Sequence, residues 1–373
     1  MQGVNKAHER FLVMISASKL MLTLVLLSIA MTSVTTVLGE SQWARYGSTP
    51  ILSTPSWAPG GLYRPRVLYD GKTFRMWFLG VSANGYNLGI GYANSIDGMK
   101  WVENAKPVLN PGGEMMAGGW ETWISIGSVI WNGSQFMMWY RGGPVSGGAA
   151  IGLATSSDGV TWTKYSGNPV MTASSIDWNV LAMPYVIQVG SAFKMWYACD
   201  NSALPAESIC YATSNDGVSW VKQSSPVLQP LSGWEAGGLY SPSVIYDGTV
   251  YGMWYSACNS SGAVCQIGYA TSKDGITWTR DPSNPILSPG PSGAWDAEGV
   301  QNQCVVQYNG GFLLYYDGYA SATSVEYIGL AQSPPNFVLP ETSSPFVVIG
   351  VAVLIVVAGL SLSRRRLTNR TQS

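Results

Sequence analysis

The sequence predicts an all-β fold, a five-bladed β-propeller with four antiparallel strands in each blade. The first observation is an internal repeat. The pattern Ile-Gly-Tyr-Ala-Thr-Ser, or a close variant, recurs at steps of 58 to 61 residues, starting at Ile90, Ile151, Ile209, Ile267 and Ile328. A fixed period of this size indicates one supersecondary unit that is copied along the chain. The second observation concerns the chain between its two ends. It consists of short apolar and aromatic runs separated by Asp-Gly and Asn-Gly, and it shows no helical periodicity.

Each unit contains four strand-like segments in the same order. An apolar run comes first, as in SVIWNG from Ser128, and an aromatic run such as FMMWY follows it. The IGYATS segment is third, and the fourth segment begins at the Trp of a Ser-x-Asp-Gly-x-x-Trp turn. The Asp of this turn recurs in four units, which indicates a structural role for Asp97, Asp158, Asp216 and Asp274. Four hairpin-connected strands in each of five units make five blades.

The fifth unit stops after its third strand, whereas the N-terminal side of the domain has one strand too many. Residues 43–46 and 50–52 resemble the fourth strand of the second unit, which begins at Trp162. We therefore expect residues 43–52 to complete the last blade and close the ring. Closure removes the open sheet edges that promote aggregation.

Four of the five cysteines flank equivalent loops between second and third strands. Cys199 and Cys210 flank this loop in the third unit, and Cys258 and Cys265 flank it in the fourth. We predict a disulfide within each pair, which fits an oxidising compartment; the alternative is four free thiols. Because the two spacings differ, we expect at least one irregular hairpin. Cys304 is predicted to be a buried free thiol.

The two ends of the chain are predicted to be targeting segments. Residues 1–39 carry Lys and Arg before the apolar run 20–30, which is typical of an export signal; an uncleaved signal anchor is the alternative. Residues 346–363 are predicted to form a transmembrane helix, because 346–362 hold no charge and three arginines follow. The positive-inside rule then makes 364–373 a cytoplasmic tail. The propeller occupies 40–338, and 339–345 are a linker.

The segment 339–342, Leu-Pro-Glu-Thr, resembles a sortase sorting signal, although Ser343 stands where that signal has Gly. Cell-wall attachment is therefore an alternative to a simple membrane anchor. Both interpretations place the propeller outside the cell. The simple anchor, which we favour, makes the protein a single-pass protein of the cell membrane.

The composition excludes several classes of function. His8 is the only histidine and precedes the apolar N-terminal run, so the domain lacks the imidazole of a catalytic triad or a His-ligated zinc site. Charged residues make up only 11% of the chain, the net charge is -1, and the body has no Lys/Arg cluster, so we expect no nucleic-acid partner. We also expect no metal, no cofactor and a monomeric protein.

The order of these motifs resembles that of the five-bladed propeller glycosidases, glycoside hydrolase families 32, 43, 62 and 68, over residues 43–338. The resemblance implies that the partner is a carbohydrate or a surface polymer, and that the activity, if the protein is an enzyme, is glycoside hydrolysis. It also implies that the pocket rim is built by the loops leading into each blade and by the loops between second and third strands.

The catalytic acids of those families cannot be transferred to this chain. The families carry them near the start of the innermost strand of the first three blades. The matching positions here hold Arg64, Ile126 and the pair Ala182-Met183, and none of these is acidic. This pattern indicates either a lost activity or a different arrangement of acids.

Glycosidic cleavage requires two carboxylates, so the candidate acids must come from elsewhere. Glu121, Glu235 and Asp296 each follow a Trp in the loop leading into a blade, and this recurrence indicates a shared structural role as the alternative to catalysis. Glu298 and Asp317 have no counterpart in the other units. Charges that break a repeat are the better functional candidates.

Arg64, Arg66 and Arg141 also break the repeat. Their forked donors suit an anionic or hydroxyl-rich ligand, and an ion pair across the channel with Glu298 is the alternative.

Three aromatic residues near the predicted rim, Tyr63, Trp123 and Tyr240, are candidates for stacking on sugar rings. Together these features predict a glycosidase-like propeller that acts on or binds carbohydrate at the cell surface. The alternative is a non-catalytic glycan-binding or structural surface protein that has lost the catalytic acids.

Overall fold

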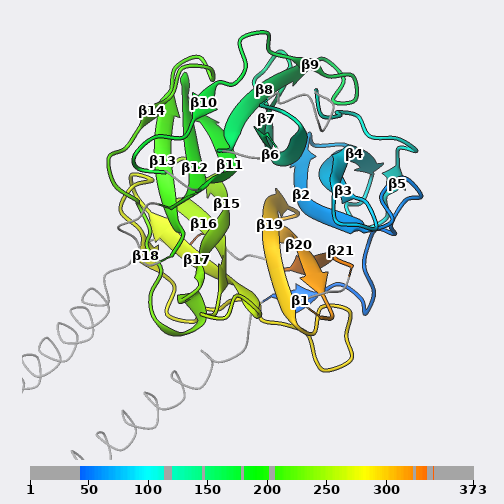
Figure 1. Ribbon diagram of the computed structural model, residues 1–373. Helices are drawn as coiled ribbons and strands as arrows, with labels where there is room; N and C mark the ends of the chain where they lie inside the picture. The colour runs from blue at the N-terminus through cyan, green and yellow to red at the C-terminus, as the bar shows by residue number, and fades with distance from the viewer. Residues whose placement is uncertain are drawn as a thin grey trace, which may run out of the picture.

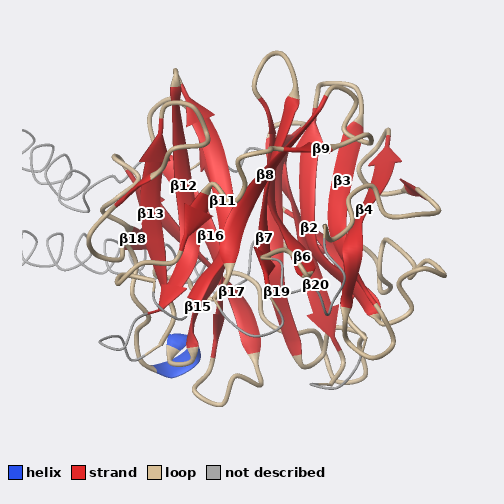
Figure 2. Cartoon of the chain, turned by 45° about the horizontal axis from the view of Figure 1, so that its top comes forward, coloured by secondary structure: helices blue, strands red, loops and turns tan. Residues whose placement is uncertain are grey.

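Five antiparallel sheets surround a central axis in the computed structural model of the chain (Figure 1). The structure describes residues 43–112, 120–144, 148–177, 180–200, 206–321, 325–333 and 339. The predicted five-bladed propeller is confirmed. Among the described residues the only helical element is η1, one 3-10 turn at Gly233–Glu235 (Figure 2).

The strands of the first three blades follow the chain outward from the axis. The first blade consists of β2 (Gly61–Tyr69), β3 (Phe74–Val81), β4 (Asn87–Ser95) and β5 (Val102–Glu103). The second consists of β6 (Trp123–Trp131), β7 (Phe136–Gly143) and β8 (Ala150–Ser156), with the short strands β9 (Thr163–Lys164) and β10 (Met171–Thr172) both paired to β8. The third consists of β11 (Val180–Val189), β12 (Ala192–Asp200), β13 (Ser208–Ser214) and β14 (Val221–Lys222).

The fourth blade repeats this order and the fifth closes the ring. The fourth consists of β15 (Gly238–Tyr246), β16 (Tyr251–Cys258), β17 (Cys265–Ser272) and β18 (Thr279–Arg280). The fifth consists of β19 (Gly299–Tyr308), β20 (Gly311–Tyr319), β21 (Tyr327–Gln332) and the N-terminal strand β1 (Ala44–Arg45). The innermost strands of neighbouring blades, β2, β6, β11, β15 and β19, contact one another around the axis.

Ring closure by the N-terminal strand is confirmed. Ala44 lies opposite Gln332 and Arg45 opposite Ala331, and the backbone N–H of Ile51 donates to the carbonyl of Ile328 at 2.9 Å. β1 and β2, which adjoin in sequence, thus lie in different blades, so the chain holds its first and last blades together.

The blades are joined by buried aromatic side chains of the second strands. The indole N–H of Trp77 donates to the carbonyl of Gly159, in the Ser-x-Asp-Gly turn of the next blade, at 2.8 Å. Trp139 and Trp196 form the same bond with Gly217 and Gly275. The last junction uses a different aromatic residue, because the Tyr315 hydroxyl donates to the carbonyl of Gly98 at 2.9 Å.

The turns that accept these bonds are shaped by their Ser and Asp side chains. In the turn of the second blade, the Asp158 carboxylate accepts the backbone N–H groups of Val160 and Thr161 at 2.8 and 2.7 Å. These bonds to the charged form lower the pKa of Asp158. The Gly at the centre has φ of +80°, a left-handed conformation that other residues rarely adopt. The expected structural role of these aspartates is confirmed, because the Asp side chain holds the backbone of the turn.

Both predicted disulfides are present, Cys199–Cys210 and Cys258–Cys265, and Cys304 is a buried free thiol. The expectation of an irregular hairpin was wrong. Cys258 lies directly opposite Cys265, whereas Cys199 lies opposite Ser208 and bonds to a residue two positions further along β13. A direct pair and a diagonal pair both lie within bonding reach, with Cα atoms 4.0 and 5.8 Å apart, so both ladders keep a regular register.

The predicted segments 1–39, 346–363 and 364–373 lie outside the described residues, and so does the linker apart from Leu339. Within the described ranges, no helix has the length and apolar character needed to cross a membrane.

The closure predicts the effect of deleting residues 43–52. The deletion exposes the edge of β21, removes the packing of Trp43 against Trp254, and takes away the partner that Arg45 provides for Asp296. We expect the variant to be recovered in the insoluble fraction and to lose cooperative thermal unfolding, whereas a control that lacks only residues 1–39 stays soluble. A deletion variant that unfolds at the temperature of the control would show that β1 is dispensable.

Candidate functional site

The innermost strands present an unusual backbone conformation to the axis. Arg64, Met183, Ser241 and Asn302 occupy equivalent positions in four blades and have φ between +46° and +58°. Each lies in a β-bulge of its innermost strand, where the register with the second strand shifts. A left-handed conformation is strained for residues other than Gly, and such strain concentrates at functional sites.

These bulges include the positions at which the resembled glycosidases carry their catalytic acids. Arg64 and the pair Ala182-Met183 stand at two of the three matching positions named from the sequence, and Met183 is the bulge residue of that pair. Ile126, the third, lies at the bulge of β6 and is buried. The bulges are therefore retained while the acids are absent, and the side chains at the axis are Arg, Met, Ser and Asn.

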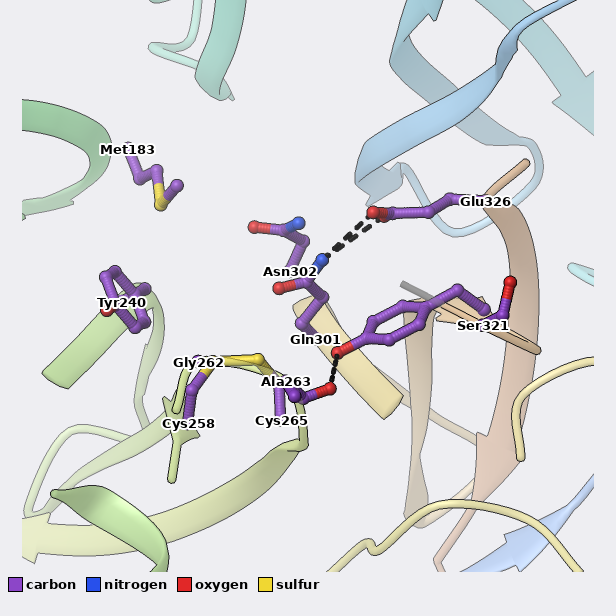
Figure 3. A pocket seen from close by; sticks show the side chains of 11 residues that line it. Met183, Tyr240, Cys258, Gly262, Ala263, Cys265, Gln301, Asn302, Ser321 and Glu326 are labelled. Atoms are coloured by element: carbon purple, nitrogen blue, oxygen red, sulfur yellow. Dashed lines mark hydrogen bonds between the residues drawn. A yellow bond between two sulfur atoms is a disulfide. The ribbon is translucent and has the colours of Figure 1, made fainter. Parts of the chain in front are cut away.

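A cavity of about 300 Å³ opens between the fourth and fifth blades beside these bulges (Figure 3). Its walls include Met183, Tyr240, Gln301, Asn302 and Glu326, together with the Cys258–Cys265 disulfide. This cavity lies beside two of the bulges, Met183 and Asn302, and Glu326 is the only carboxylate among its described lining residues.

Glu326, which the sequence analysis did not select, provides the titratable group of the cavity. Its two carboxylate oxygens accept from Gln301 Nε2 at 3.2 and 3.3 Å (Figure 3). Burial disfavours the charged form and raises the pKa of Glu326 to about 7. A carboxyl with such a pKa in a concave site can exist in both protonation states near neutral pH, which is a property of catalytic acids.

One signal in the sequence could have revealed Glu326. It lies two residues before the Ile of the third-strand motif, a position that is apolar in three blades and acidic only here and at Glu207 in the third blade. Both residues hold the next blade through their backbone carbonyls. Glu326 accepts from Leu62 N at 3.2 Å, and Glu207 accepts from Leu239 N at 2.9 Å.

Asp317 is fully buried and makes structural contacts. Both of its carboxylate oxygens accept the backbone N–H of Arg64 at 2.9 Å, and Oδ2 also accepts from Asn302 Nδ2 at 2.9 Å. Burial and the nearby Glu326 raise the pKa of Asp317 well above its ordinary value. Because Asp317 has no exposed surface, it stabilises the bulges of β2 and β19 rather than facing a ligand directly.

The structure brings together the three arginines named from the sequence. Arg64 donates through Nη1 to Ser125 Oγ, and the guanidinium of Arg141 lies 4.9 Å from the centre of the Trp123 ring. Arg66 is almost fully buried and donates to the backbone carbonyls of Gly127, Pro65 and Asn302. Burial lowers the pKa of all three, and the charge of Arg64 adds to the effect on Arg141, whose pKa falls to about 10.

All three candidate stacking residues also have polar contacts. The Tyr63 hydroxyl lies 3.5 Å from the carbonyl of Gly60, and the indole N–H of Trp123 donates to the carbonyl of Pro144 at 3.2 Å. Tyr240 lines the cavity, and its hydroxyl lies 2.6 Å from the carbonyl of Gly237 and 3.1 Å from Glu207 Oε2. Tyr63 occupies the equivalent place in the first blade, and burial together with the charges of Glu326 and Asp317 raises its pKa to about 12. Trp123 packs beneath Arg141.

The three acids that follow a Trp each bind the outermost strand of their own blade. Glu121 pairs with Lys164 at 2.6 Å, Glu235 with Arg280 at 2.8 Å, and Asp296 with Arg45 at 2.8 Å. We call this ion pair between the loop leading into a blade and the outermost strand of that blade a clamp. The third blade has an equivalent clamp between Asp177 and Lys222, which could not be recognised from the sequence because Ile176 replaces the Trp.

In the first blade all three residues of this clamp, the acid, its basic partner and the Tyr, are replaced. Ala58 stands at the position of the acid, Glu103 at the position of the base, and Phe78 at the position of the Tyr that contacts the acid in other blades. The stacking of the preceding Trp is kept, because Trp57 lies against Phe78 as Trp234 lies against Tyr255. An unpaired buried acid is thus avoided.

Glu298 directly precedes β19, the innermost strand of the fifth blade. Its side chain is exposed, and its backbone N–H donates to the carbonyl of Tyr319 at 3.0 Å. No ion pair among the described residues joins it to Arg64 or Arg66. The described residues also contain no group of three or more His, Cys, Asp or Glu side chains that could hold a metal ion.

Sequence comparison identifies relatives of the chain. The protein Rv1502 of Mycobacterium tuberculosis (strain ATCC 25618 / H37Rv) is 31% identical over 294 residues, which cover 75% of this chain and 92% of Rv1502. The chain belongs to the Rv1502 family. A β-1,2-mannobiose phosphorylase of Thermoanaerobacter sp. (strain X514) is 25% identical over 118 residues, 28% of this chain and 38% of the phosphorylase. No protein-family model matches the chain.

Solved structures place the fold among glycosidase-like propellers. A thermostable family-43 glycoside hydrolase superposes with a TM-score of 0.59 at 20% identity, covering 76% of this chain and 96% of the hydrolase. A glycosyl hydrolase from Bacteroides ovatus gives 0.59 at 18% identity, with coverage of 77% and 93%. An N-acetylgalactosamine deacetylase from F. plautii gives 0.56 at 18% identity, with coverage of 78% and 94%. The resemblance to five-bladed glycosidase-like propellers is confirmed at the level of the fold.

The clamps predict a difference between two arginine substitutions. Arg280→Ala leaves the buried Glu235 without its bidentate partner, so we expect a loss of about 1 to 3 kcal/mol of unfolding free energy. The control Arg75→Ala breaks a more exposed pair with Asp70 and should cost less than about 1 kcal/mol. Urea unfolding measures both, and equal losses would contradict a special role for the clamp.

Proposed function

We propose that the protein is an exported propeller that binds carbohydrate in the cavity between the fourth and fifth blades and cleaves a glycosidic bond there, with Glu326 as the general acid. The observation that carries this proposal is Glu326 itself, a partly exposed carboxyl with a pKa of about 7 on the wall of a concave site. The sequence relative that is a mannobiose phosphorylase and the structural neighbours that are glycoside hydrolases support a carbohydrate ligand.

The chemistry assigned to Glu326 requires its protonated form. Protonated Glu326 would donate its proton to the leaving-group oxygen while the bond from that oxygen to the anomeric carbon breaks. Water would add to the anomeric carbon and give up a proton to the ionised Glu326, which restores the protonated form. Gln301 orients the carboxyl by donating to it, and Asp317 acts as a positioning residue because it holds the adjacent bulges.

A second candidate is a glycan-binding protein without turnover. The observation in its favour is that Arg64, Ile126 and Met183 replace the family's acids, which leaves one carboxylate among the described walls of the cavity. This candidate uses the same cavity and the same class of ligand, and only the fate of the bound glycan separates the two.

Glu326→Gln tests the assignment while keeping the shape of the side chain. We expect turnover of a glycan that binds wild type to fall by at least about 100-fold, because the proton donor is lost. In wild type the rate should fall as the pH rises through about 7, because the protonated fraction of Glu326 declines. Release of reducing sugar from a polysaccharide panel, chosen by glycan-array binding, measures both effects.

The control is Glu103→Gln, the same substitution on an outermost strand, which should leave turnover unchanged. If wild type binds glycans and cleaves none, the proposed hydrolase activity is wrong and the glycan-binding function is supported. If wild type binds no glycan, both candidates are wrong.

We also propose that the protein is held at the cell membrane with its propeller outside the cell. The two disulfides support an oxidising environment, and the uncharged segment followed by three arginines supports a C-terminal anchor. Deleting residues 346–373 should move the protein from the membrane fraction to the medium, as measured by immunoblotting of fractions. Retention in the membrane after this deletion would show that the N-terminal segment anchors it instead, and full-length protein in the cytoplasm would refute export.

A further inference from the structure

Two arginines on neighbouring blades lie close to each other without forming an ion pair. Among the described residues, neither Arg64 nor Arg141 forms an ion pair with a carboxylate. Nε of each is buried and has no hydrogen-bond partner. The described contacts of the side chains are Ser125 for Arg64 and the ring of Trp123 for Arg141. Burial lowers the pKa of both arginines, and the charge of Arg64 lowers that of Arg141 further. For Arg64 itself, the attraction of Asp317 is larger than the repulsion of Arg66, and Glu326 adds a smaller attraction.

Arg66 shows what a structural arginine looks like in the same channel. It is 2% exposed, and its Nε and Nη1 donate to three backbone carbonyls that belong to three different blades, although its Nη2, like Nε of the other two, is buried without a partner. Arg64 and Arg141 are more exposed than Arg66 and have far fewer protein acceptors. Two desolvated like charges side by side are unfavourable unless an anion offsets them.

Both arginines depart from the repeat. The bulge position of Arg64 holds Met183, Ser241 and Asn302 in other blades. The position of Arg141, directly after the aromatic pair of the second strand, holds Leu79, Ala198, Ser256 and Asp317 in the other blades. Sheet packing in those blades therefore does not require Arg. Arg64 is nevertheless held in a strained conformation, because Asp317 binds its backbone N–H.

We propose that Arg64 and Arg141 form an anion subsite that binds the carboxylate of an acidic sugar, such as a uronic acid residue of a glycan. The inference rests on the proposed carbohydrate function and specifies its substrate class. Guanidinium groups match a carboxylate through pairs of parallel hydrogen bonds, and Trp123 beneath Arg141 keeps that group oriented for such contacts. The nearest buried carboxylate, Asp317, is engaged by backbone and amide donors and has a raised pKa, so it offsets the two positive charges only in part.

The test compares acidic and neutral sugars on wild type and on Arg141→Gln. Titration calorimetry with glucuronate and galacturonate, and with glucose and galactose as neutral counterparts, should show at least tenfold tighter binding of an acidic sugar by wild type. Arg141→Gln should remove that preference and leave binding of the neutral sugar within twofold. The control Arg75→Gln removes a charge that pairs with Asp70 and should keep the preference. Circular dichroism establishes that each variant is folded, and Arg141→Lys, which keeps the charge but not the fork, should restore binding only in part.

Inorganic phosphate is the second probe, because a phosphate could bind the same guanidinium groups. If phosphate binds and competes while acidic sugars show no advantage over neutral ones, the acidic-sugar proposal is wrong and the carbohydrate function still stands. Unchanged preference in Arg141→Gln overturns the subsite in the same way. Wild type that binds neither acidic nor neutral sugars overturns this inference together with the proposed function.

Discussion

The ring depends on one hydrogen bond, repeated between blades, from an aromatic side chain of a second strand to the glycine carbonyl of the next blade's turn. Each such bond buries a Trp or Tyr completely while it satisfies the polar group of that side chain, which removes the desolvation cost of an unpaired donor. The turn must have its glycine at a positive φ and its carbonyl aimed at the preceding blade, and its Ser and Asp side chains hold it in that shape. The repeated sequence motif is therefore explained by the hydrogen bond that joins neighbouring blades.

The fifth blade shows what happens where this turn is missing. Its partner in the fourth blade, Trp254, is fully buried, and its indole N–H has no acceptor among the described residues. Trp43, which precedes the closing strand β1, packs edge-on against Trp254, with ring centres 6.2 Å apart. Ring closure therefore substitutes apolar packing for a hydrogen bond at one junction of five, and the N-terminal strand has a second role beyond covering the edge of β21.

The sequence was sufficient for the fold because the fold is periodic, and insufficient for the site because the site is not. Strand order, ring closure and both disulfides follow from comparing one unit with the next. Glu326 was missed because its position is acidic in only two blades and because its burial depends on Gln301 and on the neighbouring first blade. Asp177 was missed because the clamp is defined by its basic partner on the outermost strand rather than by the preceding Trp. The convergence of Arg64 and Arg141 also required the ring, because they lie on different blades and far apart in sequence.

One buried carboxyl links the two halves of the proposed site. Asp317 binds the backbone of Arg64, which stabilises the bulge that presents one guanidinium, and it interacts electrostatically with Glu326. Coupling of this kind acts in both directions: an added negative charge on Asp317 disfavours the charged form of Glu326, and charged Glu326 disfavours that of Asp317. An anion bound at the arginines would add to the negative charge near both carboxyls and would favour protonated Glu326, the form required of a general acid. In this arrangement, binding of an acidic sugar and readiness of the proton donor are two consequences of the same local electrostatic field.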